Sequence, residues 1–471
     1  MHKVVLIRAG YTGGRLPHAL LSLAANLEEE VLILDGANPR EVLRHKDEIK
    51  NAISVGISTI TGKYIKHSLD IAKTIRSINA DVPLIWGGWH PSLKPEQTLQ
   101  NEYVDIVVVG QGEQAFRDVV KKLKCGEQVD NIVSYKYTDR SKFSIYNLNL
   151  IKNMERYITP YISPRTISLY LSQGCPLNCA FCAINSVYGR NHSAWPIEEG
   201  VELIDYSVRN HFIDGVHFDD DNFFIGKRRP LEFSDRLLQH NLEINWSANA
   251  RVDVLCNLEA EEWRLLDQSG CKRLLVGAES GSQMILDKLN KKISPDMILE
   301  FGRLCGEYRI IPCFSMMVGV PGETEKDVKA TFKLIEVLKR KVPTSELLLF
   351  LYVPYPGTAL YDLSLRMGFY EPQSLEEWSE CYLDVPTVPW VNKKLVEQVK
   401  KYNRILPLRQ DISLKNKRKS RRTPRIYIRK IENAFFRTQS LVRAFNETQN
   451  KREALAKYLH RKRSKWRHRS N

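Results

Sequence analysis

The sequence predicts an α/β protein with a doubly wound parallel sheet, then a partial barrel of six βα units, then a basic helical tail. Three observations support this prediction. Short apolar runs alternate with helix-like segments over the first 150 residues, the alternation resumes with longer helices over about 164–390, and basic residues concentrate at the end of the chain. The 471 residues leave room for two or three domains. We place these at 1–150, 151–390 and 391–471.

Five short apolar runs predict the buried parallel strands of the first domain. Ligands of such sheets bind beyond the carboxyl ends of the strands. Ser58 follows the third run, and Gly87 and Gly88 follow the fourth, where a glycine lets the backbone approach a ligand closely. The expected strands are 4–7, 31–34, 54–57, 84–86 and 106–109, and the expected helices are 17–27, about 64–78 and 113–123.

Six further strands are expected in the second domain, and six βα units indicate an open, partial parallel barrel. Chemistry in barrels gathers at the carboxyl ends of the strands, and polar residues follow the strands of this domain at those points. One of these polar segments is the turn that starts at Gly319, after the fifth strand. This turn can serve the site, or it can simply begin a helix with Thr324 as its N-cap. The expected strands are 167–171, 215–218, 244–248, 273–276, 313–318 and 347–352.

Three cysteines, Cys175, Cys179 and Cys182, follow the first strand of the second domain. Thiolates are soft ligands that suit zinc or iron–sulfur clusters. A structural zinc site normally has four ligands, and no fourth Cys or His follows at finger-like spacing. Three thiolates on a four-iron cluster would leave one iron open to a substrate or cofactor. The alternative is three buried free thiols, but such close spacing favours a metal site. The six other cysteines are scattered and are expected to serve in packing.

The cysteine motif resembles that of the radical S-adenosylmethionine (SAM) enzymes. The glycine-bearing turns 58–62, 87–91 and 110–113 of the first domain resemble the cobalamin-binding domain that precedes the core in one large subgroup. The resemblance covers most of residues 3–390. It implies a Rossmann-like cobalamin-binding domain, a TIM-type partial barrel, and three cofactors: a 4Fe-4S cluster on the three cysteines, SAM and cobalamin. The alternative for the first domain is a cofactor-free sheet that only packs on the second.

The resemblance also implies roles for individual residues of the second domain. The aromatic Phe181 is expected near the SAM adenine. The acidic loop 219–221, which follows the second expected strand of this domain, stands where the family has a Gly-Gly-Glu that binds the methionyl amino group. Taken alone, this loop would be read as a solvated turn or helix cap. A polar pair reaches the ribose or carboxylate, and an arginine can pair with the carboxylate. These residues are, in the same order, Asp219, Asp220 and Asp221, then Glu279 and Ser280, then Arg251.

In the first domain, the resemblance implies that Ser58, Gly87 and Gly88 line the slot for the nucleotide tail of cobalamin. The histidine loop that supplies a cobalt ligand in this family is replaced here by residues 8–14. Cobalamin is therefore expected to bind without a histidine nitrogen on cobalt. His90, in the loop beside the site, is expected to be solvated rather than a ligand.

The implied activity is reductive cleavage of SAM to a 5′-deoxyadenosyl radical, with C-methylation of an unactivated carbon of a small metabolite, natural product or lipid. A reductant such as flavodoxin or ferredoxin is an expected partner. The alternatives are ring closure, rearrangement or oxidation without methyl transfer, a tRNA methylthio-transferase, and a non-catalytic cobalamin or redox sensor. The methylthio-transferases carry a cysteine-bearing first domain, whereas the first 174 residues here contain only Cys125.

The chain has a net charge of +15, yet residues 412–471 hold 20 Lys/Arg against 3 acids, so residues 1–411 are close to neutral. Nucleic-acid binding is therefore not expected from charge alone. A helix is expected at 394–405, a basic linker at 413–425, and a basic amphipathic helix at 426–445 that can lie on an anionic membrane or dock on its own barrel. Without an evident leader or long apolar run, the sequence indicates a cytoplasmic protein, peripheral at a membrane at most.

Overall fold

The computed structural model describes residues 3–10, 14–381 and 388–403. The expected helix at 394–405 is helical over 393–403, where the described part ends. The expected basic linker at 413–425 and the amphipathic helix at 426–445 lie outside the described residues. Among the helices that are described, none combines the length and the apolar character needed to span a membrane.

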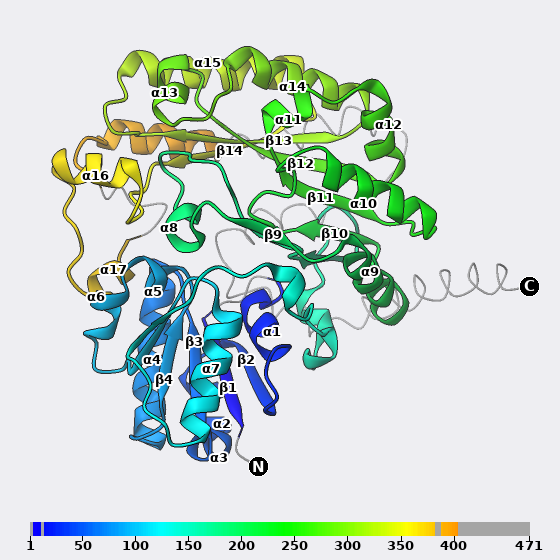
Figure 1. Ribbon diagram of the computed structural model, residues 1–471. Helices are drawn as coiled ribbons and strands as arrows, with labels where there is room; N and C mark the ends of the chain where they lie inside the picture. The colour runs from blue at the N-terminus through cyan, green and yellow to red at the C-terminus, as the bar shows by residue number, and fades with distance from the viewer. Residues whose placement is uncertain (1–2, 11–13, 382–387, 404–471) are drawn as a thin grey trace, which may run out of the picture. The chain divides into compact units, whose positions relative to one another are not determined.

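The first domain is a six-stranded parallel sheet in the order β2-β1-β3-β4-β5-β6, drawn in blue and cyan in Figure 1. Because the order reverses between β1 and β3, successive right-handed crossovers place helices on both faces, as expected for a doubly wound sheet. The strands are β1 (Val4–Ala9), β2 (Val31–Ala37), β3 (Ser54–Ser58), β4 (Leu84–Gly87), β5 (Ile106–Val109) and β6 (Ile132–Ser134).

Both faces of this sheet are buried, which explains the uninterrupted apolar runs of its strands. Alternate residues of β1 face opposite sides: Leu6 belongs to the core cluster of Leu20 and Phe116, and Ile7 to the cluster that includes Ile65. The helices are α1 (His18–Ala24), α2 (Pro39–Arg44), α3 (Lys46–Lys50), α4 (Lys63–Ile78), α5 (Trp89–Leu93), α6 (Pro95–Leu99) and α7 (Gly112–Lys124).

The second domain holds another parallel sheet, in the order β14-β13-β12-β11-β10-β7. This order follows the chain without reversal, so right-handed crossovers place the helices on one face. Within the described residues the edge strands β7 and β14 do not pair with each other, so the barrel is open, as predicted. The strands are β7 (Thr166–Leu169), β10 (Gly215–Phe218), β11 (Asn245–Ala250), β12 (Cys271–Glu279), β13 (Ile311–Val318) and β14 (Glu346–Leu351).

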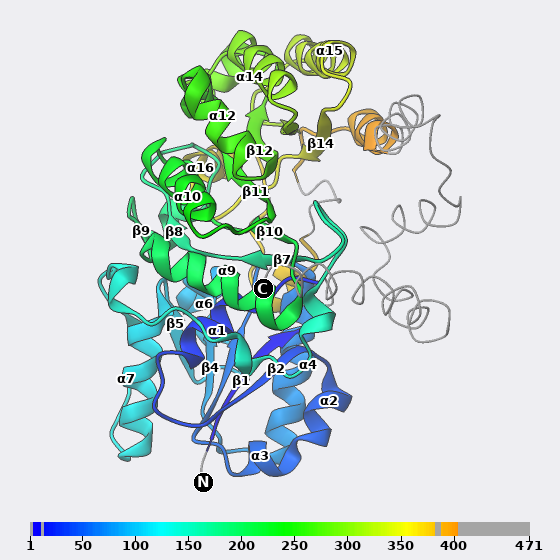
Figure 2. The ribbon, with the colours of Figure 1, turned by 90° about the vertical axis from the view of Figure 1, so that its right-hand side faces the viewer.

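Figure 2 shows α10, α12 and α14 along the outer face of this second sheet. Thr324 caps α15: its hydroxyl accepts a hydrogen bond from the Asp327 N–H, and the Asp327 carboxylate accepts one from the Thr324 N–H, so the capping alternative for this turn is confirmed. The helices are α9 (Ile197–His211), α10 (Arg228–Gln239), α11 (Val252–Cys256), α12 (Ala260–Gln268), α13 (Gln283–Lys288), α14 (Pro295–Glu307), α15 (Glu325–Lys341), α16 (Ala359–Arg366) and α17 (Leu375–Ser379).

Three short 3-10 turns join the two sheets. The two strands of a small antiparallel hairpin lie on either side of the cysteine loop along the chain. The turns are η1 (Arg140–Lys142), η2 (Leu148–Leu150) and η3 (Met154–Tyr157). The hairpin pairs β8 (Ser172–Gly174) with β9 (His192–Ala194), and the helix α8 (Ile184–Tyr188) lies between its strands. This hairpin was not predicted, because three-residue strands leave no periodic signal in a sequence.

Candidate active site

The loop that carries Cys175, Cys179 and Cys182 leaves the hairpin at Gly174. The backbone of Gly174 has a φ of 84°, and a Cβ there would lie 2.3 Å from the Asn191 carbonyl oxygen, so only glycine fits this turn. All three thiols are partly exposed. Burial raises the pKa of the Cys182 thiol to about 12, and a metal must therefore displace a proton to bind this sulfur.

Backbone hydrogen bonds anchor this loop to two distant segments of the second domain. The Ala180 N–H donates to the Leu289 carbonyl at 3.0 Å, and the Leu360 N–H donates to the Ala180 carbonyl at 2.9 Å. Phe181 packs in the same cluster as Leu289 and Leu360. In the described residues, no group of three or more His, Cys, Asp or Glu side chains is arranged to hold a single metal ion.

The acidic loop follows β10 and is held in place by a stack of aromatic rings. Phe223, directly after the loop, stacks on Phe218 of β10 with ring centroids 4.5 Å apart. Asp221 joins this loop to the cysteine loop, since its carboxylate accepts a hydrogen bond from the Gly174 N–H at 2.8 Å and one from the Tyr170 hydroxyl at 2.9 Å. This contact brings the acidic loop against the start of the cysteine loop.

Asp220 is fully buried, and its carboxylate is used inside the protein. The Leu171 N–H donates to it at 2.9 Å, and the Ser172 hydroxyl donates to its other oxygen. Burial raises the pKa of this carboxyl to about 7, even though both hydrogen bonds favour the ionised form. Asp220 therefore positions β8 beneath the cysteine loop.

Asp219 has different surroundings, because it faces the first domain. Its two oxygens lie 3.5 Å from His18 Nε2 and 3.4 Å from His217 Nε2, and Arg15 Nη1 lies 3.3 Å away. Burial alone would raise the pKa of Asp219, but the hydrogen bond from His18 and the charge of Arg15 lower it to about 2. Burial lowers the pKa of His217 to about 4, so that ring is neutral near pH 7. An ionised carboxylate between two histidines can orient a polar group or hold a cation.

Glu279 ends β12 in an unusual backbone conformation, with a φ of 58° in the left-handed region. Its carboxylate lies 3.1 Å from the ammonium of Lys291, which also stands 5.8 Å from the Phe181 ring. Burial would lower the pKa of Lys291, but the charge of Glu279 outweighs it and the pKa is raised. Lys291 therefore adds a cation that sequence analysis did not assign to the region of Phe181 and Glu279.

The two other residues expected to bind SAM have their own internal partners. Ser280 is fully buried, and its hydroxyl lies 3.0 Å from that of Thr331. Arg251 donates to Asp253 at 2.7 Å. The other oxygen of Asp253 and the side-chain oxygen of Asn222 are buried without a hydrogen-bond partner in the described residues. These orphaned acceptors suit a ligand that carries an ammonium group.

A cavity of about 390 Å³ opens at the carboxyl ends of β1, β3, β4 and β5. Ser58, Gly87 and Gly88, which are expected to line the cobalamin slot, all line this cavity. A Cβ on Gly88 would lie 2.6 Å from the Thr59 carbonyl oxygen, and its φ is 97°, so only glycine keeps this turn narrow. The same cavity is lined by residues of the second domain, which are Tyr170, Gln173, Tyr188, Trp195, Asp219 and Asp221.

The prediction that His90 is solvated was wrong. This histidine lies on α5, is fully buried, and contacts the Thr61 hydroxyl through Nδ1 at 3.2 Å. Burial lowers its pKa to about 4, so the ring is neutral. No local signal indicated this burial, because α5 is a five-residue helix and the ring of Trp378, which packs edge-on against His90, lies 288 positions further along the chain.

Comparison with known proteins identifies both domains. Residues 3–120 match the B12 binding domain, and residues 169–335 match the radical SAM superfamily. An uncharacterized methyltransferase of Pyrococcus horikoshii is 28% identical over 374 residues, which are 76% of this chain and 79% of that protein. An anaerobic magnesium-protoporphyrin IX monomethyl ester cyclase of Rubrivivax gelatinosus is 24% identical and aligns with 61% of this chain and 56% of its own length.

Among solved structures, the radical SAM methyltransferase TsrM from Kitasatospora setae, with cobalamin and a 4Fe-4S cluster bound, shares the fold. Its TM-score is 0.64 at 17% identity, and the match covers 78% of this chain and 76% of that one. The two domain matches imply a 4Fe-4S cluster, SAM and cobalamin as cofactors. The cysteine loop, the orphaned acceptors and the glycine-walled cavity suit these groups. The chain therefore joins a B12 binding domain to a radical SAM domain, and it is a radical SAM enzyme.

Proposed function

We propose that this enzyme methylates an unactivated carbon of a small metabolite, natural product or lipid. One observation carries the proposal: the cavity at the glycine turns of the B12 binding domain shares its wall with the acidic loop of the radical SAM domain. A methyl group carried by cobalamin and a radical formed from SAM would therefore lie close enough to act on one substrate. The methyltransferase names of the Pyrococcus and Kitasatospora relatives support the same activity.

When bound, the cofactors supply a 5′-deoxyadenosyl radical and a transferable methyl group, and the chain positions them. Cys175, Cys179 and Cys182 would hold the cluster. Asp221 fixes the cysteine loop through Gly174. The other residues that we propose near SAM are Phe181, Asp219, Asp220, Arg251, Glu279, Ser280 and Lys291.

We also propose that no histidine nitrogen binds cobalt. His18 is held against Ser168 and Asp219, with Nε2 lying 3.2 Å from the Ser168 hydroxyl, and the buried His90 contacts Thr61. Electron paramagnetic resonance of the Co(II) form is expected to show no nitrogen superhyperfine splitting. Splitting that disappears in His18→Ala or His90→Ala would contradict the proposal.

The activity is tested by anaerobic reconstitution with iron, sulfide, cobalamin and SAM that carries a trideuterated methyl group. A reductant is needed, and flavodoxin or ferredoxin can be compared with dithionite. Mass spectrometry of small-molecule and lipid extracts is expected to show a new product heavier by one trideuterated methyl group. Cys179→Ala, which removes a cluster ligand, is expected to abolish the product.

A second candidate is ring closure without methyl transfer, favoured by the similarity to the cyclase of Rubrivivax gelatinosus. The same experiment separates the two activities. Ring closure would consume SAM to 5′-deoxyadenosine and leave the trideuterated methyl group out of the product.

A further inference from the structure

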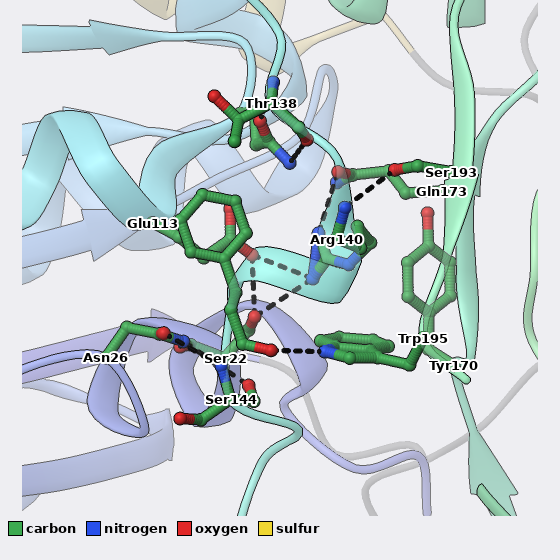
Figure 3. A network of polar contacts seen from close by, with 12 residues as sticks. Ser22, Asn26, Glu113, Thr138, Arg140, Ser144, Tyr170, Gln173, Ser193 and Trp195 are labelled. Atoms are coloured by element: carbon green, nitrogen blue, oxygen red, sulfur yellow. Dashed lines mark hydrogen bonds and ion pairs between the residues drawn. The ribbon is translucent and has the colours of Figure 1, made fainter. Parts of the chain in front are cut away.

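One buried guanidinium joins the cofactor cavity to the hairpin that precedes the cysteines. Arg140 is 2% exposed, and its Nη2 donates to Glu113 at 2.8 Å and to the Ser22 hydroxyl at 2.9 Å. Its Nη1 donates to the side-chain oxygen of Gln173 at 2.7 Å, and its charge lies 4.1 Å from the Trp195 ring. Figure 3 shows these side chains converging on Arg140 from both domains.

The segment that carries Arg140, the linker segment (residues 137–146), is hydrogen-bonded to the B12 binding domain. Gln111 exchanges two hydrogen bonds with the backbone of Thr138, at 2.8 and 2.9 Å. The Ser144 N–H donates to the Asn26 side chain at 3.1 Å. Thr138, Ser144 and Asn26 appear around Arg140 in Figure 3.

The same segment is also bonded to the hairpin β8–β9. The Tyr137 hydroxyl donates to the Gln173 carbonyl at 3.0 Å, and the Arg140 N–H donates to the Ser193 hydroxyl at 3.1 Å. The Trp195 indole N–H donates to the Phe143 carbonyl at 2.9 Å. The linker segment therefore moves only if bonds to one of the two domains break.

The cysteine loop is also held on its far side, where α8 meets the turns of the B12 binding domain. The Tyr188 ring lies 6.0 Å from the ring of Trp89, which directly follows Gly88. A Cβ on Gly110 would lie 3.0 Å from the Val187 carbonyl oxygen. The segments before and after the three cysteines thus both contact the walls of the cofactor cavity.

We infer that Arg140 is a positioning residue that couples occupancy of the cobalamin cavity to the placement of the cluster loop. Glu113, Arg140 and Gln173 all line the cavity, and Gln173 is two residues from Cys175. Arg140 Nε and one Glu113 oxygen are buried without a partner in the described residues, so the network is sensitive to rearrangement. A ligand that orders this wall also orders the cysteine loop, and by reciprocity the cluster tightens binding of the ligand.

The test measures the affinity of the full chain for hydroxocobalamin twice, once with a reconstituted cluster and once without iron. The ratio of the two dissociation constants is the coupling factor, which we expect at roughly 5- to 150-fold in the natural protein. In Arg140→Met the factor is expected to fall toward one. If Arg140 only stabilised the fold, replacing it would lower the melting temperature and leave this ratio unchanged.

A second variant covers the case in which Arg140→Met fails to fold. Gln173→Ala keeps the buried Arg140–Glu113 ion pair and removes the side-chain bond from Arg140 to the hairpin, together with a hydrogen bond to Tyr188, so the factor is again expected to fall. The matched control is Lys94→Met, which breaks a contact with Glu371 between the same domains but touches neither the cavity nor the hairpin. A ratio near one in the natural protein, or a natural ratio retained in Gln173→Ala, would overturn the inference.

Discussion

The carboxyl ends of the two sheets meet the same cavity with different chemistry. The first sheet presents Ser58, Gly87, Gly88 and an apolar wall, and one turn is so narrow that a single Cβ would collide with backbone. The second presents the carboxylates Asp219 and Asp221 to the cavity, while its cysteine loop and the Glu279–Lys291 pair lie outside the cavity lining. We expect the first end to recognise a large ligand mainly by its shape and the second end to hold charged groups. The two ends should therefore fail in different ways when they are mutated.

The largest effect is expected on the thiol side. Cys175→Ala, Cys179→Ala and Cys182→Ala should each lose the cluster iron and all reductive SAM cleavage, because we propose these three thiolates as the ligands that the chain supplies to the cluster. Hydroxocobalamin should still bind. Iron analysis and 5′-deoxyadenosine assays measure the loss, with Cys125→Ala as the exposed control. Native protein loaded with zinc and no iron would disprove the cluster assignment.

Glu279→Gln should weaken SAM binding and leave iron content intact. A hydrogen bond to a charged group contributes about 1.5–3 kcal/mol, which corresponds to roughly a tenfold to hundredfold loss of affinity. Isothermal titration under anaerobic conditions measures it. Glu307→Gln, an exposed carboxylate of α14, is the matched control. Equal affinities in both variants would remove Glu279 from the SAM site.

Gly88→Val tests the shape side. The new side chain collides with the Thr59 carbonyl and occupies a strained backbone region worth about 1–3 kcal/mol, so the turn must move. Cobalamin affinity should fall about tenfold or more, while the cluster still assembles. Gly226→Ala, where an added Cβ meets nothing within 4 Å, should bind normally. If Gly88→Val bound cobalamin normally, the narrow turn would have no part in the slot.

The last prediction concerns Asp220 and the pH dependence of stability. Its folded pKa of about 7 lies above the ordinary value of 3.8, so the folded state binds the proton more tightly than the unfolded state. Its contribution to stability is full below about pH 4 and is lost as the pH rises through 7, by up to about 1.4 kcal/mol per pH unit. Denaturant unfolding between pH 4 and 8 should show a flatter profile for Asp220→Asn. Parallel profiles for the two proteins would place the Asp220 pKa near its ordinary value.

Sequence reasoning found every long strand of both sheets, because buried parallel strands are continuous apolar runs that leave a local signal. The glycine turns and the cysteine loop could be located in the fold as well, since their positions follow from the ends of those strands. The elements that were missed are short: the hairpin β8–β9 and α5 are too brief to show a period. Both lie next to the cavity, so the sequence did not predict these parts of the site.

Contacts between residues that are distant along the chain could not be predicted, for a different reason. His18 meets Asp219 across 201 positions, and Arg140 meets Glu113 and Gln173 from an irregular linker segment. A single sequence records neither which sheet edges face each other nor which carboxylate the protein uses internally. The acidic loop was therefore predicted as one group of three equivalent residues, whereas the structure gives Asp219, Asp220 and Asp221 three different sets of contacts.

The left-handed backbone of Glu279 has a consequence for any engineering of this enzyme. A residue with a Cβ is strained at this φ of 58°, and glycine would adopt it freely. Selection for heat resistance alone should therefore enrich the substitution Glu279→Gly among surviving variants, and those survivors should have lost the Glu279–Lys291 pair. Natural retention of a glutamate at such a position would mark a compromise in which durability is given up for chemistry.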